Sequence, residues 1–202
     1  MVFSSLLFLF IFLVVTLALY YILPRRARNT LLLVVSLFFY AWGEPKYVLL
    51  MIISILAGWI CGFGVEKSKS KAGRRVWLIA ALVITLGFLA YFKYADFFVS
   101  SFNAMTGLGL PLLKLALPVG ISFYTFQCLS YTIDVYRGNA QVQKNPISFG
   151  AYVSLFPQLI AGPIVRYVDV ARELDNRTHS WNDFALGCRR FLLGLAKKIL
   201  IA

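Results

Sequence analysis

The sequence is poor in charge, in cysteine and in histidine. Only 14% of its 202 residues are charged, just eight of them are Asp or Glu, and it has three cysteines and one histidine. A chain that is 60% hydrophobic is too apolar to be intrinsically disordered. Three cysteines exclude a disulfide scaffold, and a water-soluble domain would be about 25% charged. The composition therefore indicates an integral membrane unit.

The net charge of +12 does not indicate nucleic-acid binding. Nucleic-acid-binding proteins carry Lys and Arg on a solvated face among polar residues. Here the basic residues form short clusters between apolar runs, and no charged residue occurs from Met1 to Pro24. Because this is the pattern of cytoplasmic loops in membrane proteins, we predict a lipid bilayer as partner and no nucleic acid.

Long uncharged runs predict an all-α integral membrane protein. A helix needs about 20 apolar residues to cross a bilayer. We expect one membrane domain over 1–202, a multi-helix transmembrane bundle with broken or re-entrant segments, in which Phe97–Leu113 is only partly helical. The predicted membrane segments are 5–23, 30–42, 47–65, 76–92, 115–134, a broken or re-entrant 147–162, and an amphipathic or interfacial helix over 184–202.

Loop charges predict the orientation. Basic residues follow the first apolar run, at 25–28, and this order is the reverse of a signal peptide. The segment Glu66–Arg75 is strongly basic, so we place it in the cytoplasm. Lys93 and Asp96 cancel, and we place them in an outer loop. The chain is therefore predicted to be multi-pass, with its N-terminus outside.

The run Leu115–Ile133 is apolar but carries hydroxyl and amide groups. Unpaired polar groups in hydrocarbon are costly, so these must face protein or a wet cavity. Gln127 and Tyr131 are four residues apart and Tyr124 precedes Gln127 by three, so the three share one helix face. Interhelical hydrogen bonding is one explanation and a cavity lining is the other. The candidate lining residues are Ser122, Tyr124, Gln127 and Tyr131.

The run Asn145–Val165 contains three prolines and two glycines. Pro157 removes a backbone donor, and Gly162 before Pro163 makes a further break. Irregular backbone at membrane depth is tolerated only where it is buried in protein or lines a cavity. We therefore expect a broken or re-entrant segment at a functional cavity, with a plain kinked helix as the alternative. Its candidate lining residues are Pro157, Gln158, Gly162 and Pro163.

The remaining reactive side chains predict no separate site. His179 lies in a polar loop, where we expect it to be solvated and not catalytic. Gly58 and Gly62 form a GxxxG pattern, which predicts close helix packing. The cysteines are expected to be small buried hydrophobes, without the spacing of a metal site. They are Cys61, Cys128 and Cys188.

Three stretches are long and specific enough to suggest a family. They are Pro118–Gln127 (PVGISFYTFQ), Tyr131–Gly138 (YTIDVYRG) and Phe156–Tyr167 (FPQLIAGPIVRY), with shorter matches at Leu37–Pro45 and Tyr91–Tyr94. On these residues the chain resembles the membrane-bound O-acyltransferase family, and within it the bacterial group that acetylates alginate. The resemblance implies a many-helix membrane core in the bacterial inner membrane, with a tunnel between donor and acceptor.

The resemblance also implies a reaction. An acetyl thioester, either acetyl-CoA or an acyl carrier, would donate acetyl groups from the cytosol, with no bound cofactor. An exopolysaccharide such as alginate would accept them, with periplasmic acetyltransferase partners. A hydroxyl needs a base within hydrogen-bond reach to become a good nucleophile.

In the family this base is a histidine in a later apolar segment, expected beyond Ala202. We therefore assign no catalytic residue to this chain and expect it to be inactive alone, as the N-terminal portion of the transferase. The alternative is a degenerate, non-catalytic membrane subunit or conduit.

Overall fold

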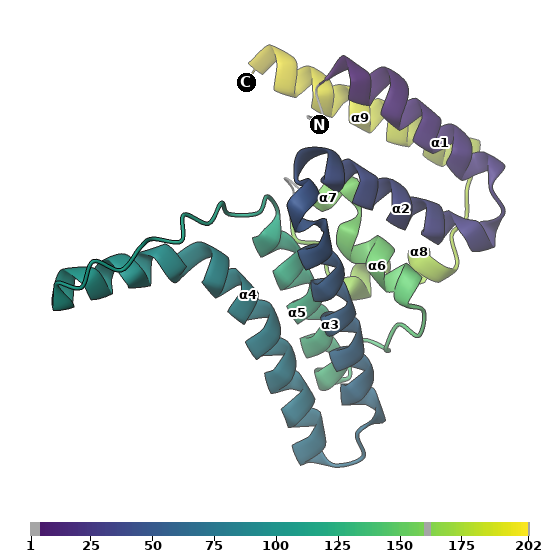
Figure 1. The fold of residues 1–202 in the computed structure, drawn as a ribbon. Coiled ribbons are helices and arrows are strands. Elements are labelled where there is room, and N and C mark those ends of the chain that lie inside the picture. The colour runs from purple at the N-terminus through teal and green to yellow at the C-terminus, as the bar shows by residue number, and fades with distance from the viewer. Residues whose placement is uncertain (1–4, 160–162, 202) are drawn as a thin grey trace.

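The computed structural model describes residues 5–159 and 163–201, and all regular structure within those ranges is helical (Figure 1). The elements are a π-helical turn η1 (Phe8–Phe12), α1 (Leu13–Ile22), α2 (Arg25–Gly43), a 3-10 turn η2 (Pro45–Tyr47), α3 (Val48–Lys67), α4 (Lys71–Thr106), α5 (Ile121–Arg137), α6 (Pro146–Ser154), α7 (Phe156–Leu159), α8 (Tyr167–Asp175) and α9 (Trp181–Ile201). The predicted all-helical class is thus confirmed for the part of the chain that the structure describes.

The core forms where α3, α4 and α5 pack against one another, with α6 and α2 beside them (Figure 1). Its buried side chains are mostly large, and most of them come from α3, α5 and α6. Glycine lets α3 and α5 approach closely: a Cβ on Gly62 would lie 2.4 Å from Cε1 of Tyr131, and one on Gly58 would lie 3.0 Å from Cβ of Cys128. The packing predicted from the GxxxG pattern is therefore confirmed.

Several helices begin or end where the sequence did not lead us to expect. α2 begins at Arg25, whereas the predicted membrane segment begins at residue 30. Pro24, directly before it, has an extended backbone and separates α2 from α1. Lys93 and Asp96 do not form a loop, because α4 continues through both to Thr106 and ends at Gly107, with φ of 70°; the outer side on which we place them stays a prediction. A balanced charge pair does not stop a helix, whereas a left-handed glycine does.

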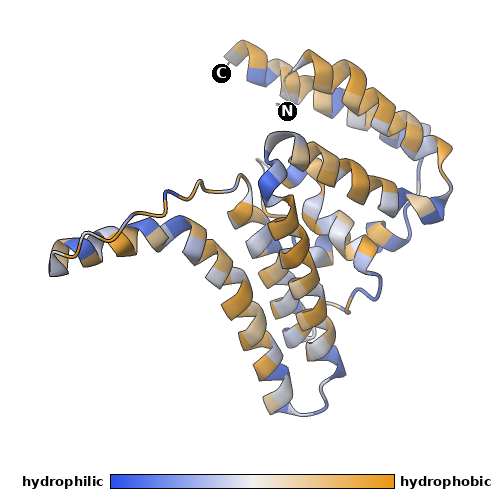
Figure 2. Cartoon of the chain, in the orientation of Figure 1, coloured by the Kyte–Doolittle hydropathy of each residue, from blue (hydrophilic) through white to orange (hydrophobic). Residues whose placement is uncertain are grey.

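Two elements are long and apolar enough to cross a membrane, namely Pro45–Lys67 and Lys71–Thr106 (Figure 2). The first apolar helix, Phe8–Ile22, is shorter. Within 115–134, helix begins only at Ile121, after the turn at Pro118 and Gly120. The run 97–113 is partly helical, as expected, because its helix ends at Thr106.

The two C-terminal segments differ in their packing. The run from 145 is broken at Leu155 into α6 and the short α7, and α6 is almost wholly buried. The predicted helix over 184–202 begins earlier, at Trp181, and most of α9 is exposed. Figure 1 shows α9 lying alongside α1, away from the α3–α5 core.

Candidate functional site

One side of α5 buries four polar side chains. Tyr124, Gln127, Tyr131 and Asp134 follow one another at spacings of three, four and three residues, so they project from one side of the helix. All four are at most 2% exposed. We call them the α5 polar face. The first three were predicted from the sequence, whereas Asp134 was not, although it continues the same spacing.

Several buried polar atoms of the α5 polar face have no hydrogen-bond partner among the described residues. The hydroxyls of Tyr124 and Tyr40 lie close to each other without a hydrogen bond of good geometry. Oε1 of Gln127 and Oδ2 of Asp134 have no hydrogen-bond partner among the described residues. Because a buried polar atom without a partner is costly, such atoms call for an explanation such as a bound group. This face is therefore the strongest candidate for contact with a polar ligand.

Asp134 forms the one ion pair of the described residues. Its Oδ1 accepts a hydrogen bond from a terminal nitrogen of Arg166 at 2.5 Å, and the Asp134 side chain is 3% exposed while that of Arg166 is 51% exposed. The carboxylate also raises the pKa of Arg166. The pair ties the end of α5 to the segment just before α8. Sequence reasoning missed it because the two residues are 32 positions apart.

Gln143 connects three helices through a single residue. Its backbone N–H donates to the Tyr131 hydroxyl at 3.0 Å, and its carbonyl accepts from Nε1 of Trp59 at 2.7 Å. Its side-chain amide donates to the Tyr167 hydroxyl and to the Asp175 carboxylate. Burial, followed by the nearby charge of Asp175, raises the pKa of Tyr167 to about 12. Tyr131 thus makes the kind of hydrogen bond between elements that the structural explanation predicted.

The break between α6 and α7 is held by side chains. The Phe156 N–H, which has lost its helical partner, donates to the Ser36 hydroxyl of α2 at 3.2 Å. Nε2 of Gln158 donates to the Tyr152 carbonyl at 2.5 Å, and the Tyr152 hydroxyl donates to the Val165 carbonyl at 2.7 Å. The freed backbone groups are thus satisfied within the protein, as irregular backbone in an apolar setting requires.

The structure brings the beginning of α5 against the end of α7. Gly120 has φ of 78°, and a Cβ there would lie 2.9 Å from the Leu159 carbonyl oxygen. Only a residue without a side chain fits both this backbone angle and this approach. The two segments that the sequence singled out as unusual are therefore neighbours in space.

The other predicted lining residues are not part of the α5 polar face. Ser122 is half-buried and projects from the opposite side of α5. Pro157 and Pro163 are exposed, while Gln158 is half-buried. Gly162 lies outside the described residues. The structure thus gathers Tyr124, Gln127 and Tyr131, and leaves a tunnel lining as a prediction.

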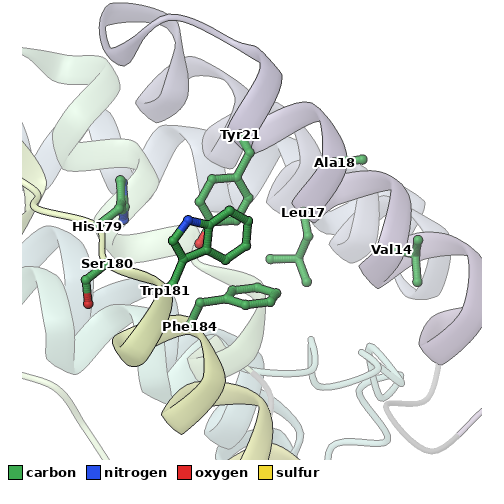
Figure 3. Close-up of a pocket in the computed structure, with 8 residues that line it drawn as sticks. All are labelled: Val14, Leu17, Ala18, Tyr21, His179, Ser180, Trp181 and Phe184. Carbon is green, nitrogen blue, oxygen red and sulfur yellow. The ribbon is translucent and has the colours of Figure 1, made fainter.

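A separate apolar cavity of about 680 Å³ lies between α1 and the start of α9 (Figure 3). In Figure 3 the rings of Tyr21, Trp181 and Phe184 gather around it. It contains none of the residues predicted to line a tunnel. The complete lining is Val14, Leu17, Ala18, Tyr21, His179, Ser180, Trp181 and Phe184.

His179 stands at the edge of this cavity without the companions of a catalytic base. Its Nε2 is 3.2 Å from the Tyr20 hydroxyl, and Arg177 donates to the same hydroxyl at 3.1 Å. Partial burial, then the charges of Arg28 and Arg177, lowers the pKa of His179. The adjacent Ser180 hydroxyl donates to the Asp183 carboxylate at 2.6 Å, so this hydroxyl is not aligned with the imidazole. The histidine is exposed, as predicted.

The cysteines and acidic residues form no further site in the described ranges. Cys61 and Cys128 are buried as predicted, but Cys188 is exposed, because the described residues leave most of the α9 surface uncovered. Among those residues no group of three His, Cys, Asp or Glu could hold a metal ion.

Comparison with known proteins finds relatives along the whole chain. It is 46% identical to the probable alginate O-acetylase AlgI of Pseudomonas aeruginosa and 46% identical to that of Pseudomonas putida. It is 34% identical to the peptidoglycan O-acetyltransferase of Helicobacter pylori. These alignments cover 100% of this chain, but 40%, 43% and 44% of the respective relatives.

The expected resemblance to alginate O-acetylases is therefore confirmed, and the chain spans less than half the length of these relatives. No protein-family profile matches the chain. No solved structure matches it either.

Proposed function

We propose that this chain forms part of the membrane core of an O-acetyltransferase that acetylates a polysaccharide. The observation that carries the proposal is similarity over all of its residues to proteins named for alginate and for peptidoglycan O-acetylation. Both names describe acetyl transfer to a sugar hydroxyl, so the shared chemistry is more secure than the choice of polymer. Alginate is the acceptor that we favour, because the relatives named for it are the more similar.

In the proposed reaction an acetyl thioester, either acetyl-CoA or an acyl carrier, reacts with a hydroxyl of the polymer. The carbon–sulfur bond breaks, the carbon–oxygen bond of the new ester forms, and the hydroxyl proton passes through a base to the departing thiolate. We place that base, a histidine by resemblance, outside this chain. His179 does not fit the role, because its imidazole contacts Tyr20 and lies apart from the α5 polar face.

We assign the α5 polar face the task of orienting the acetyl group or its acceptor. The carboxamide of Gln127 and the hydroxyl of Tyr124 lie in an apolar setting, where a hydrogen bond to a ligand is strong because water does not compete. The broken α6–α7 segment would border the same passage, since α7 touches the beginning of α5. Exclusion of water would also protect the thioester from hydrolysis.

The proposed location is the bacterial inner membrane, with several membrane passes and the N-terminus outside. The strongly basic turn between α3 and α4 supports this orientation. Acetyl transfer to a polymer outside that membrane would involve periplasmic acetyltransferase partners.

A chimera tests the proposal directly. This chain would replace the segment that it matches in the alginate O-acetylase of Pseudomonas aeruginosa, in cells that lack their own copy. We expect alginate acetylation to be restored, measured as ester-linked acetate per uronate. A chimera present in the membrane at normal abundance that acetylates neither alginate nor peptidoglycan would contradict the proposal.

Point variants of the chimera test the lining. Gln127→Ala should lower acetylation at normal abundance, whereas Gln141→Ala, in an exposed loop, should not. Gly162→Leu should block acetylation without loss of protein, because added bulk would obstruct the passage. Full acetylation by Gln127→Ala and Gly162→Leu would remove the proposed lining role.

A further inference from the structure

The second half of α4 projects away from the bundle (Figure 1). α4 has 36 residues and is therefore about 54 Å long at 1.5 Å per residue, whereas the hydrocarbon core of a bilayer is about 30 Å thick. If Val76–Phe92 crosses the membrane, the helix beyond Lys93 has no hydrocarbon left to span. We call Lys93–Thr106, together with the extended segment 107–117 that returns alongside it, the α4 arm (Figure 1).

The α4 arm uses its polar side chains internally. Oδ1 of Asp96 accepts hydrogen bonds from the backbone N–H groups of Leu113 and Lys114, at 2.7 and 3.2 Å. Oδ1 of Asn103 accepts from the Leu110 N–H at 3.0 Å, and Nδ2 of Asn103 donates to the Leu110 carbonyl at 2.8 Å. These bonds satisfy backbone groups that extended chain would otherwise offer to water. These bonds attach the extended segment to α4, so the helix and the segment form one structural unit.

The outer surface of the α4 arm is apolar on both its helix and its extended segment. Phe97, Phe98 and Met105 on the helix are 64%, 66% and 87% exposed. No charged residue occurs between Asp96 and Lys114. Isolated exposed apolar residues are ordinary, but a contiguous set marks an interaction surface. The other exposed large apolar residues of the arm are Tyr94, Phe102, Leu108, Leu110, Leu112, Leu113 and Leu117.

The base of the arm carries the residues of a membrane interface. Lys93 of the helix and Lys114 of the extended segment lie there, and Nζ of Lys93 lies 5.4 Å from the centre of the Tyr94 ring. Tyr91 and Tyr94 are both exposed. Tyrosines at a membrane boundary and lysines facing anionic headgroups are typical of interfacial anchors.

We propose that the α4 arm is an anchor that lies in the headgroup region of the leaflet opposite the α3–α4 turn, with its phenylalanines and leucines in the acyl boundary and its two lysines at anionic lipid phosphates. A lipid surface fits better than a protein partner, because apolar residues are exposed on both the helix and the extended segment. The only charged residues of the arm are Lys93 and Lys114 at its base and Asp96, whose carboxylate accepts backbone hydrogen bonds. The inference rests on the membrane placement proposed above.

Site-specific fluorescence in vesicles tests this inference. The three native cysteines are replaced by alanine in the full chain, and single reporter cysteines are placed at Phe98, Met105, Val83 or Lys69. Each is labelled with an environment-sensitive fluorophore. The chain is then reconstituted into vesicles of phosphatidylethanolamine and phosphatidylglycerol, with or without lipids that carry a nitroxide quencher at a shallow or a deep position.

The reporters at Phe98 and Met105 should lose fluorescence to the shallow nitroxide more than to the deep one, because an interfacial segment lies roughly 5–10 Å into the headgroup boundary. The reporter at Val83, in the middle of the proposed span, should lose more to the deep nitroxide. Lys69, in the polar turn, is the matched control and should lose fluorescence to neither.

Two outcomes would overturn the inference. Blue-shifted emission at Phe98 and Met105 without nitroxide quenching would mean that protein covers the arm, and water-like emission would mean that nothing does. The reporter at Val83 separates this failure from failure of the membrane placement. If Val83 is quenched and the arm is not, only the anchor is wrong; if Val83 is also unquenched, the membrane placement itself fails.

Discussion

The helices α3 and α9 have nearly the same length, 20 and 21 residues, and both place glycines among apolar residues. Their glycines have opposite surroundings. A Cβ on Gly58 or Gly62 of α3 would collide with α5, whereas Gly187 and Gly194 of α9 have nothing within 4 Å. Glycine weakens a helix by about 0.5–1 kcal/mol relative to alanine unless a close approach repays that loss. Of these two helices, only α3 has glycines with a packing reason in this structure.

The comparison extends to the large side chains. Met51 and Val65 of α3 are fully buried, whereas Leu192 and Leu200 of α9 are 62% and 82% exposed. Hydrophobic content therefore does not tell which apolar helix belongs to the core. Glycine content alone does not tell it either, because the glycines of α9 meet no neighbour; what distinguishes α3 is that its glycines face side chains of α5.

The largest expected effect is at the α3–α5 contact. Gly62→Leu should destabilise the folded chain by about 3 kcal/mol, the upper end for overpacking, because even a Cβ would lie 2.4 Å from the Tyr131 ring. The measurement is thermal unfolding of the detergent-solubilised chain followed by circular dichroism. Gly87→Leu is the matched control, since Gly87 of α4 has nothing within 4 Å. Equal stability of the two variants would show that α3 and α5 do not pack as described.

A smaller loss should follow from separating the buried carboxylate from its partner. Arg166→Ala leaves Asp134 buried without its cation, so the unfolding temperature should fall. The double variant Arg166→Ala with Asp134→Asn should regain part of the loss, because the amide carries no charge. Arg172→Ala, on exposed α8 surface, serves as the control. A double variant less stable than both single variants would argue against a paired role.

Next in size is the Tyr131 hydroxyl. Tyr131→Phe removes the acceptor of the Gln143 N–H and should cost about 1–2 kcal/mol, because a buried donor is left without a partner. Tyr94→Phe removes an exposed hydroxyl and should cost nothing measurable. Chemical unfolding of both variants in the same detergent provides the comparison, and similar midpoints would sink this prediction.

On α9, replacing a glycine should raise the stability of the chain, whereas on α3 it should lower it. Gly187→Ala should stabilise the chain by about 0.5–1 kcal/mol, because alanine favours helix and its Cβ meets nothing. The same change at Gly58 should destabilise, with Cβ of Cys128 at 3.0 Å. Thermal unfolding of the pair measures both effects. A loss at Gly187 would mean that a neighbour packs closely against α9.

The smallest effect concerns pH at the α1–α9 side of the molecule. The pKa of His179 is lowered in the folded chain, so the unfolded chain takes up a proton first as the pH falls. The stability contributed by His179 is therefore fully present above its ordinary pKa of about 6.5 and decreases as the pH falls below it. Between neutral and mildly acidic pH, the unfolding temperature should fall by more for the native chain than for the His179→Gln variant. Equal falls would exclude the histidine as the cause.

Local patterns in the sequence were sufficient to predict the all-helical class, the shared side of Tyr124, Gln127 and Tyr131, and a break in the run after Asn145. The end of α4 was misplaced because the balance of Lys93 and Asp96 bears on membrane side and not on helix termination. Pairs between distant residues, such as Asp134 with Arg166, depend on how the helices pack. No local pattern encodes that packing.

The hydrogen bond from Trp59 to Gln143 spans 84 positions of sequence and therefore has a consequence for biogenesis. A ribosome releases α3 and α4 long before it has made the residue that accepts the bond. The indole of Trp59, and Gly62, against which the Tyr131 ring packs, therefore have no partner from α5 or from Gln143 while those residues are still being synthesised. The helices α3 and α4 are thus synthesised before α5, which packs against both of them. The hydrogen bond from Trp59 to Gln143 can form only after α5 has been made, because Gln143 follows α5 in the sequence.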